Sequence, residues 1–225
     1  MNKLKISIIA LVASMFMTVT SFAGVTVGLS AALAGIEASG TETLKDSSAI
    51  QSHTEQANAV IPSVFLELAH SNGFGIGVDV VTVTADLSGS NQSTTQIATG
   101  NTEGNDEGTN TANAEVDGIV TTYLIKSFDS GLFVKLGVAS ADVNTKEVLG
   151  TGTTYGNTSV DGAHYGIGFQ RTNDSGLFIR AAAEYTDFDS LSLTGSQVGG
   201  TASSFNVIKA DVDVAMAKFS IGKAF

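Results

Sequence analysis

The chain has 225 residues, enough for one β-barrel domain or for one to two ordinary domains. It contains 25 Gly, one Pro and no Cys, which excludes a disulfide scaffold, a thiolate metal site and a lipoprotein anchor. Acidic side chains outnumber basic ones by 22 to 11, and the resulting net charge of −11 argues against a nucleic-acid partner.

The first 23 residues have the organisation of a secretory signal peptide. Lys3 and Lys5 form a basic start, an apolar core follows, and small residues precede a cleavage site after Ala23. We therefore divide the chain into a signal peptide over 1–23 and one mature domain over 24–225. An uncleaved membrane anchor is the alternative, but the apolar core is short for a span and an alternating pattern begins directly after it.

The mature chain alternates between apolar and polar residues in eight segments, as half-buried β-strands do. Tight turns rich in Asn, Asp, Ser and Gly and longer polar loops separate these segments in strict alternation. The predicted strands cover 24–33, 60–70, 74–87, 116–128, 132 onward, 160–171, 177–188 and 205–225. The predicted tight turns cover 71–73, 129–131 and 173–176, and the predicted loops cover 39–58, 88–115, 145–159 and 194–204.

The last predicted strand has the most specific local pattern. Phe219, Ile221 and Phe225 share one face, whereas Lys218 and Ser220 share the other. This pattern resembles the C-terminal insertion signal of outer-membrane β-barrel proteins, in which alternating apolar residues lead to a final Phe. The resemblance implies that Phe219, Ile221 and Phe225 form an assembly signal recognised by the barrel-assembly machinery.

The resemblance extends to the whole mature chain. An even number of strands, short turns at one end and apolar faces of about 9–11 residues are typical of bacterial outer-membrane barrels. The chain resembles the small eight-stranded members of this group, such as the OmpA transmembrane domain, OmpX, OmpW and the opacity proteins. This resemblance implies an all-β, eight-stranded antiparallel up-and-down transmembrane barrel in a Gram-negative outer membrane, with both mature termini in the periplasm.

Such barrels carry aromatic residues at the lipid interfaces. Because the chain has no Trp, its aromatic girdle would come from Phe and Tyr. The candidates are Phe74, Tyr123, Tyr165, Phe169, Tyr185, Phe219 and Phe225.

The strand pattern assigns a set of charged side chains to the barrel interior, which has little room beyond its own side chains. Because an unpaired charge there is costly, we expect a salt-bridge network, with Glu67 paired to Arg180 or Lys135. A narrow water or ion path gated by the same pairs is the alternative. The predicted lumen network comprises Glu67, Asp79, Lys126, Lys135, Arg180, Glu184 and Lys218, with His164 and Gln170 beside it.

Acidic residues gather at the predicted outer ends of the strands and in the loops. They form either a solvated rim or a site where divalent cations bridge carboxylates to lipopolysaccharide phosphates. The predicted acidic rim comprises Asp86, Asp117, Asp142, Asp161, Asp187, Asp189, Asp211 and Asp213, with Glu103, Asp106 and Glu107 in the longest loop.

The sequence offers little support for catalysis, and we predict no catalytic residue, cofactor or metal site. His70 and Ser71 resemble the His/Ser pair of lipid A deacylase barrels, but they fall at a periplasmic turn, far from outer-leaflet lipid. We expect a monomeric outer-membrane protein with a structural or surface-interaction role and four long acidic loops. A narrow porin-like channel, a lipid-active enzyme and a soluble secreted β-protein are the alternatives.

Overall fold

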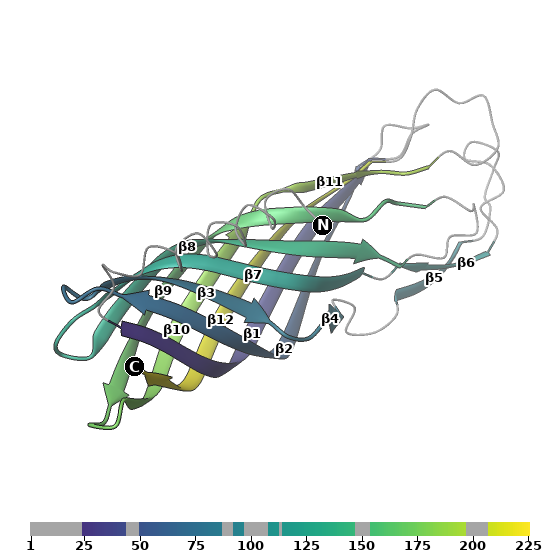
Figure 1. Ribbon diagram of the computed structural model, residues 1–225. Coiled ribbons are helices and arrows are strands. Elements are labelled where there is room, and N and C mark those ends of the chain that lie inside the picture. The colour runs from purple at the N-terminus through teal and green to yellow at the C-terminus, as the bar shows by residue number, and fades with distance from the viewer. Residues whose placement is uncertain are drawn as a thin grey trace.

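Alternating residues along the chain produce long β-strands that pair with antiparallel neighbours (Figure 1). The computed structural model describes residues 24–43, 50–86, 92–96, 108–112, 114–146, 154–196 and 207–225. The predicted signal peptide lies outside these residues. No helix in this part of the chain is long and apolar enough to cross a membrane.

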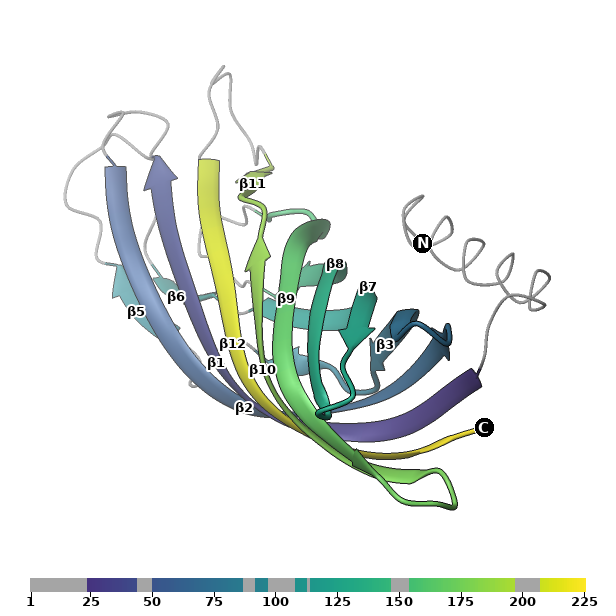
Figure 2. The ribbon, with the colours of Figure 1, turned by 90° about the vertical axis from the view of Figure 1, so that its left-hand side faces the viewer.

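Eight strands close into a barrel (Figures 1 and 2). Each strand pairs with the next one along the barrel, and pairing of the first strand with the last closes the wall. The barrel strands are β1 (Gly24–Thr43), β2 (Ile50–Ala69), β3 (Phe74–Val81), β7 (Ala114–Ser127), β8 (Leu132–Thr145), β9 (Thr158–Thr172), β10 (Leu177–Phe188) and β12 (Val207–Ala224). The predicted fold class, an eight-stranded antiparallel barrel, is confirmed.

Four short strands lie beyond the eight that form the barrel. β4 (Ala85–Asp86) adds to β7, and β11 (Leu191–Thr194) adds to β12. β5 (Gln92–Gln96) and β6 (Gly108–Ala112) pair only with each other. The sequence predicted an irregular loop over 88–115, so this hairpin is a difference from the prediction.

The first two strands are also longer than their apolar pattern predicts. The predicted loop over 39–58 is mostly strand, because β1 and β2 stay paired from Gly24↔Ala69 to Thr43↔Ile50. The distal halves of both strands are polar, so their two faces do not alternate in hydrophobicity. Backbone pairing continues there without an apolar face, which is why the pattern underestimated the strand length.

Three tight turns connect strands at one end of the barrel and share one geometry. In each turn a Gly with φ between 83° and 92° donates its N–H to the carbonyl three residues earlier, at 2.9–3.0 Å. A positive φ is easily reached only without a Cβ, so Gly is required at these positions. The three glycines are Gly73, Gly131 and Gly176. The predicted tight turns are therefore confirmed.

Strand β7 changes which parity faces inward along its length. Its pairing with β8 shifts between Asp117 and Val120, and Gly118 lies there with φ of 58°. Such a bulge inserts an extra residue and rotates the following side chains. Val116 and Ile119 consequently both pack against the buried apolar cluster around Phe188.

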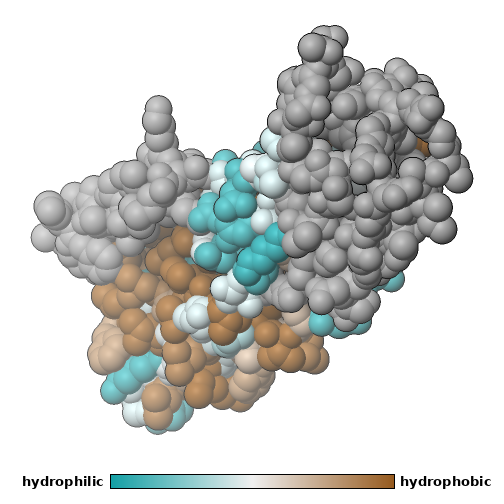
Figure 3. Space-filling view, turned by 90° about the vertical axis from the view of Figure 1, so that its right-hand side faces the viewer, coloured by the Kyte–Doolittle hydropathy of each residue, from teal (hydrophilic) through white to brown (hydrophobic). Residues whose placement is uncertain are grey.

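The outer wall of the barrel carries large apolar side chains on every strand. Figure 3 shows hydrophobic residues gathered over the lower part of one face, with hydrophilic residues beyond them. A water-soluble monomer rarely exposes so large an apolar surface, whereas a closed barrel in lipid requires one. The outward-facing residues include Val27, Leu29, Leu33, Val64, Leu124, Leu136, Val138, Ile167, Ile179, Phe219 and Ile221. We call this surface the lipid-facing belt.

Most of the predicted girdle residues lie on the outer wall, with one exception. Phe74, Tyr165, Phe169, Tyr185, Phe219 and Phe225 are exposed. Tyr123 is buried inside the barrel, so its assignment to the girdle is wrong. Tyr123 lies on the same parity as the inward residues Thr121 and Ile125, and its ring occupies space left by Gly77 on the adjacent strand.

We predict that Leu136→Arg destabilises the folded barrel in phospholipid vesicles by about 2–4 kcal/mol, the cost of a cation on a mid-membrane lipid face. Leu136 is 57% exposed in the belt. The matched control is Ile50→Arg, since Ile50 is 66% exposed at the distal start of β2. Urea titration of both variants measures the effect, and equal losses would contradict the assignment of the belt to lipid.

Candidate functional site: a charge network inside the barrel

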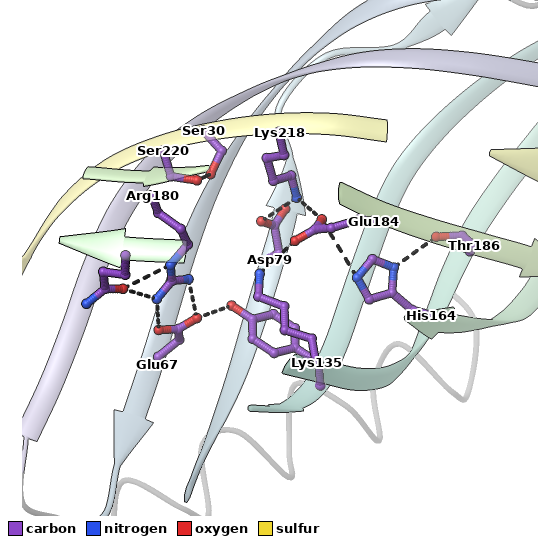
Figure 4. A network of polar contacts seen from close by, with 12 residues as sticks. Ser30, Glu67, Asp79, Lys135, His164, Arg180, Glu184, Thr186, Lys218 and Ser220 are labelled. Carbon is purple, nitrogen blue, oxygen red and sulfur yellow. Dashed lines mark hydrogen bonds and ion pairs between the residues drawn. The ribbon is translucent and has the colours of Figure 1, made fainter. Parts of the chain in front are cut away.

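Inward-facing positions on all eight strands place polar side chains in the lumen. Figure 4 shows them in two neighbouring clusters, one around Arg180 and one around Glu184. Both of these residues come from β10 and lie on its inward parity. The network is buried, although most of its members are ionisable.

The first cluster is built on an ion pair between Arg180 and Glu67. The guanidinium donates from Nη1 to Oε1 at 2.7 Å and from Nη2 to Oε2 at 2.8 Å. The Tyr123 hydroxyl donates to the same Oε1 at 2.8 Å. The Gln170 amide oxygen accepts from Arg180 Nε at 3.0 Å and from Nη2 at 2.7 Å. A bidentate pair with additional partners is the arrangement in which buried charges are best compensated.

Aromatic rings surround the guanidinium of Arg180. Its Cζ lies 4.8 Å from the ring centre of Phe133, 5.0 Å from that of Phe65 and 5.3 Å from that of Phe178. Cation–π attraction favours this position, and the rings fill the space around the ion pair. This half of the lumen is therefore occupied by packed side chains.

Glycines on neighbouring strands make room for these rings. A Cβ on Gly77 would lie 2.4 Å from the Tyr123 ring, and a Cβ on Gly168 would lie 2.4 Å from the Phe133 ring. Both distances are far inside van der Waals contact. The inward glycines are therefore part of the lumen packing.

The second cluster is built on Glu184. One carboxylate oxygen pairs with Lys135 Nζ at 2.9 Å, and the other pairs with Lys218 Nζ at 2.9 Å. Lys218 also contacts Asp79 Oδ2 at 3.0 Å. His164 Nε2 lies 3.7 Å from Glu184, and its Nδ1 is 2.9 Å from the Thr186 hydroxyl.

Lys135 joins the two clusters, because its Nζ also lies 4.3 Å above the Tyr123 ring. In the described part of the chain, the lumen thus holds three cations (Lys135, Arg180, Lys218) and three anions (Glu67, Asp79, Glu184), each in at least one ion pair. Such a neutral set avoids the large penalty of an isolated buried charge.

Lys126 lies outside the network to which the sequence assigned it. It shares the outward parity of Leu124, and its Nζ donates to the Asn72 carbonyl at 2.5 Å. The same Nζ lies 4.4 Å from the Phe74 ring centre. A long cation near a strand end can extend along an apolar wall to reach polar groups at the turn, so Lys126 needs no lumen partner.

Sequence reasoning missed the aromatic part of the lumen. Phe65, Phe133 and Phe178 are buried around Arg180, and the Tyr123 hydroxyl donates a hydrogen bond to Glu67. A usable signal was present, because each ring lies on inward parity next to a glycine of an adjacent strand.

The three predicted assembly-signal residues face outward at the β1–β12 seam. Phe219 and Ile221 lie beside Ala31 and Leu29 of β1. The Phe225 backbone N–H donates to the Val25 carbonyl at 2.8 Å. The closing seam therefore extends to the last residue of the sequence.

Part of the predicted acidic rim can be placed. Asp187 pairs across strands with Asp213, and Asp213 accepts a hydrogen bond from the Tyr185 hydroxyl at 2.6 Å. Asp117 is the cross-strand partner of Asp142. Glu103, Asp106, Glu107 and the side chain of Asp86 lie outside the described residues.

Comparisons with known proteins give only distant similarity. No family model matches the chain, and no curated protein matches it. OprG from Pseudomonas aeruginosa is similar over 92% of this chain and 98% of its own, with 15% identity and a TM-score of 0.49. Ail, the attachment invasion locus protein of Yersinia pestis, in complex with the heparin analogue sucrose octasulfate, matches over 90% and 99% with 12% identity and a TM-score of 0.43.

A third similar structure is the outer membrane protease OmpT from Escherichia coli, which matches over 92% of this chain and 98% of its own, with 9% identity and a TM-score of 0.48. All three TM-scores lie below 0.5, so the fold assignment rests on the strand pairing and the lipid-facing belt described above. The chain has the architecture of an outer-membrane β-barrel protein.

We predict that Tyr123→Phe lowers the free energy of unfolding in micelles by about 1.5–3 kcal/mol, the contribution of a hydrogen bond to a charged group. The loss is expected because Glu67 is buried and cannot replace the hydroxyl with water. The matched control is Tyr185→Phe, which removes a hydroxyl–carboxylate bond at the exposed surface and should change stability little. Equal effects in urea titrations would contradict a special role for the lumen.

Proposed function

We propose that this chain is a monomeric outer-membrane protein of a Gram-negative bacterium with a structural and surface-interaction role. In this proposal the lumen is occluded and carries no solute. The outer strand ends and loops then form the surface that interacts with partners, and the barrel anchors this surface in the membrane.

The observation that carries the proposal is the side-chain network that connects seven of the eight barrel strands through the lumen and joins the eighth, β1, to its neighbour β12. The two clusters link inward side chains of β2, β3, β7, β8, β9, β10 and β12. The Ser30 and Ser220 hydroxyls, 2.8 Å apart, join β1 to the adjacent strand β12. Contacts that cross the barrel in several directions resist widening of the lumen and support a structural role.

The proposed orientation follows from the turns and the distal strand ends. The end with three tight turns would face the periplasm. Both mature termini would lie at the same end, because the first residues of β1 pair with the last residues of β12. The long, polar continuation of β1 and β2 would then project outside the cell. Its polar surface includes a hydrogen bond from Gln56 to Glu37 at 2.8 Å.

The proposed partners follow from the chemistry of the two surfaces. The belt would contact outer-membrane lipid. Acidic pairs such as Asp187 and Asp213 would interact with lipopolysaccharide phosphates through divalent cations, because carboxylates and phosphates repel each other without a metal.

A narrow channel is the main competing function, because the network is a polar path that rearranging ion pairs could open. We predict no unit conductance steps when the purified protein is inserted into planar bilayers. The members of both clusters are buried inside the barrel and paired with one another, which is the physical reason for this expectation.

Heat-modifiable gel mobility provides the control that the barrel is folded, and a general porin provides the control for insertion. Reproducible unit steps that change when Glu67 or Arg180 is neutralised would overturn the occluded-lumen proposal and favour the channel.

A catalytic role receives no support from the His70 turn. His70 Nδ1 accepts the Asn72 backbone N–H at 3.3 Å, and Asn72 Oδ1 accepts the Phe74 N–H at 3.0 Å. These contacts organise a hairpin turn. A lipid-active enzyme would instead show itself as a mass shift of lipid A on expression.

The proposed assembly role of the last strand predicts that Ile221→Asp reduces the amount of folded protein in outer membranes. Its matched control is Ile179→Asp, because Ile179 is the cross-strand neighbour of Ile221 and the two are 54% and 52% exposed. Both changes place a carboxylate in lipid, but only Ile221 lies in the proposed signal. Comparable loss in both variants, measured by heat-modifiable mobility, would contradict the signal.

A further inference from the structure

A cavity of about 60 Å³ lies inside the barrel on the far side of the charge network from the tight turns. It lies between two buried apolar clusters, one around Phe188 and one around Ile36, which share Val212 and Val214 as packing partners. The second cluster of the network forms its polar end. The structural and surface role proposed above makes no use of this cavity.

The walls of the cavity are mainly apolar. Its apolar lining includes Ile36, Ile61, Val81, Phe188 and Met216. An apolar wall offers water no hydrogen bonds, so it favours the hydrocarbon part of a ligand over water.

One wall residue carries an unmet hydrogen bond. Ser63 lines the cavity and is 3% exposed, and its Oγ has no hydrogen-bond partner in the described part of the chain. A buried hydroxyl without a partner costs free energy. A ligand with one hydrogen-bonding group near Ser63 would remove that cost.

The charges beside the cavity determine whether the hydrogen-bonding group of the ligand is charged or neutral. Lys218 already contacts both Asp79 and Glu184, and Lys135 contacts Glu184. An ionic ligand would add a charge to a set that is already balanced, at a large desolvation penalty. The hydrogen-bonding group is therefore a neutral one, such as a hydroxyl or a carbonyl.

The volume of the cavity limits the size of the ligand. At about 10–15 Å³ for each water-sized group, the cavity accepts roughly four to six such groups. We propose that it binds a short-chain neutral amphiphile, an alcohol or ketone whose polar group bonds to Ser63 and whose alkyl chain lies against the apolar wall.

The chain contains a natural probe for this site. Met216 lines the cavity and is the sole methionine after residue 23. The protein is prepared in lipid nanodiscs with ¹³C-methyl methionine, the Met216 signal is assigned with Met216→Leu, and 1-butanol is titrated. We expect a saturable shift of the Met216 methyl signal.

Two serine variants make the experiment specific. Ser63→Ala should weaken 1-butanol binding by about two- to tenfold, the effect of one hydrogen bond. Ser140→Ala should leave it unchanged, since Ser140 is also buried with no Oγ partner among the described residues but does not line the cavity. Neither change removes an existing bond, so both variants should fold.

Charged analogues of the probe test the neutral head group. Butylammonium and butyrate should give no saturable shift. A non-saturable 1-butanol shift, equal in wild type, Ser63→Ala and Ser140→Ala, would mean that the alcohol only partitions into lipid and would overturn the proposal. Saturable binding of either ion as tight as that of 1-butanol would overturn the assignment of a neutral ligand.

Discussion

The buried ion pair between Glu67 and Arg180 is the interaction on which the rest of the barrel depends. It joins β2 to β10 across the lumen with two charged hydrogen bonds, at 2.7 and 2.8 Å. A buried ion pair is not stabilising in itself, because desolvation can exceed the Coulombic gain. Here Tyr123 and Gln170 supply further hydrogen bonds, so neither charge is left partly unmet.

The lipid environment explains why the sequence places this pair and the other polar side chains inside the barrel. In lipid the outer wall must be apolar, so polar side chains move to the interior and have to satisfy one another there. Three cations and three anions among the described residues pair with one another, and four aromatic rings pack around the ion pairs. Inward glycines have no side chain and so leave space for those rings, as Gly77 does beside Tyr123. The result is an interior whose side chains connect the strands of the wall to one another.

Sequence periodicity predicted the barrel because the lipid face imposes strict alternation, and it placed Glu67, Asp79 and Lys218 in the lumen for the same reason. It misplaced Lys126 and Tyr123 because a long cation and an amphipathic ring suit both the lumen and an interface, so residue type does not decide between them. The distal ends of β1 and β2 were missed since both faces are polar there. Pairings such as Lys218 with Asp79, 139 residues apart, depend on strand register and barrel curvature, which periodicity does not contain.

The most direct test is a double-mutant cycle on Glu67→Gln and Arg180→Met, with unfolding by urea in phospholipid vesicles as the measurement. If the pair holds the lumen together, each single change should cost about 3–5 kcal/mol, because it leaves an uncompensated buried charge. The double change should then cost clearly less than the sum of the two. Additive losses, or single losses no larger than those of exposed ion pairs, would contradict this account.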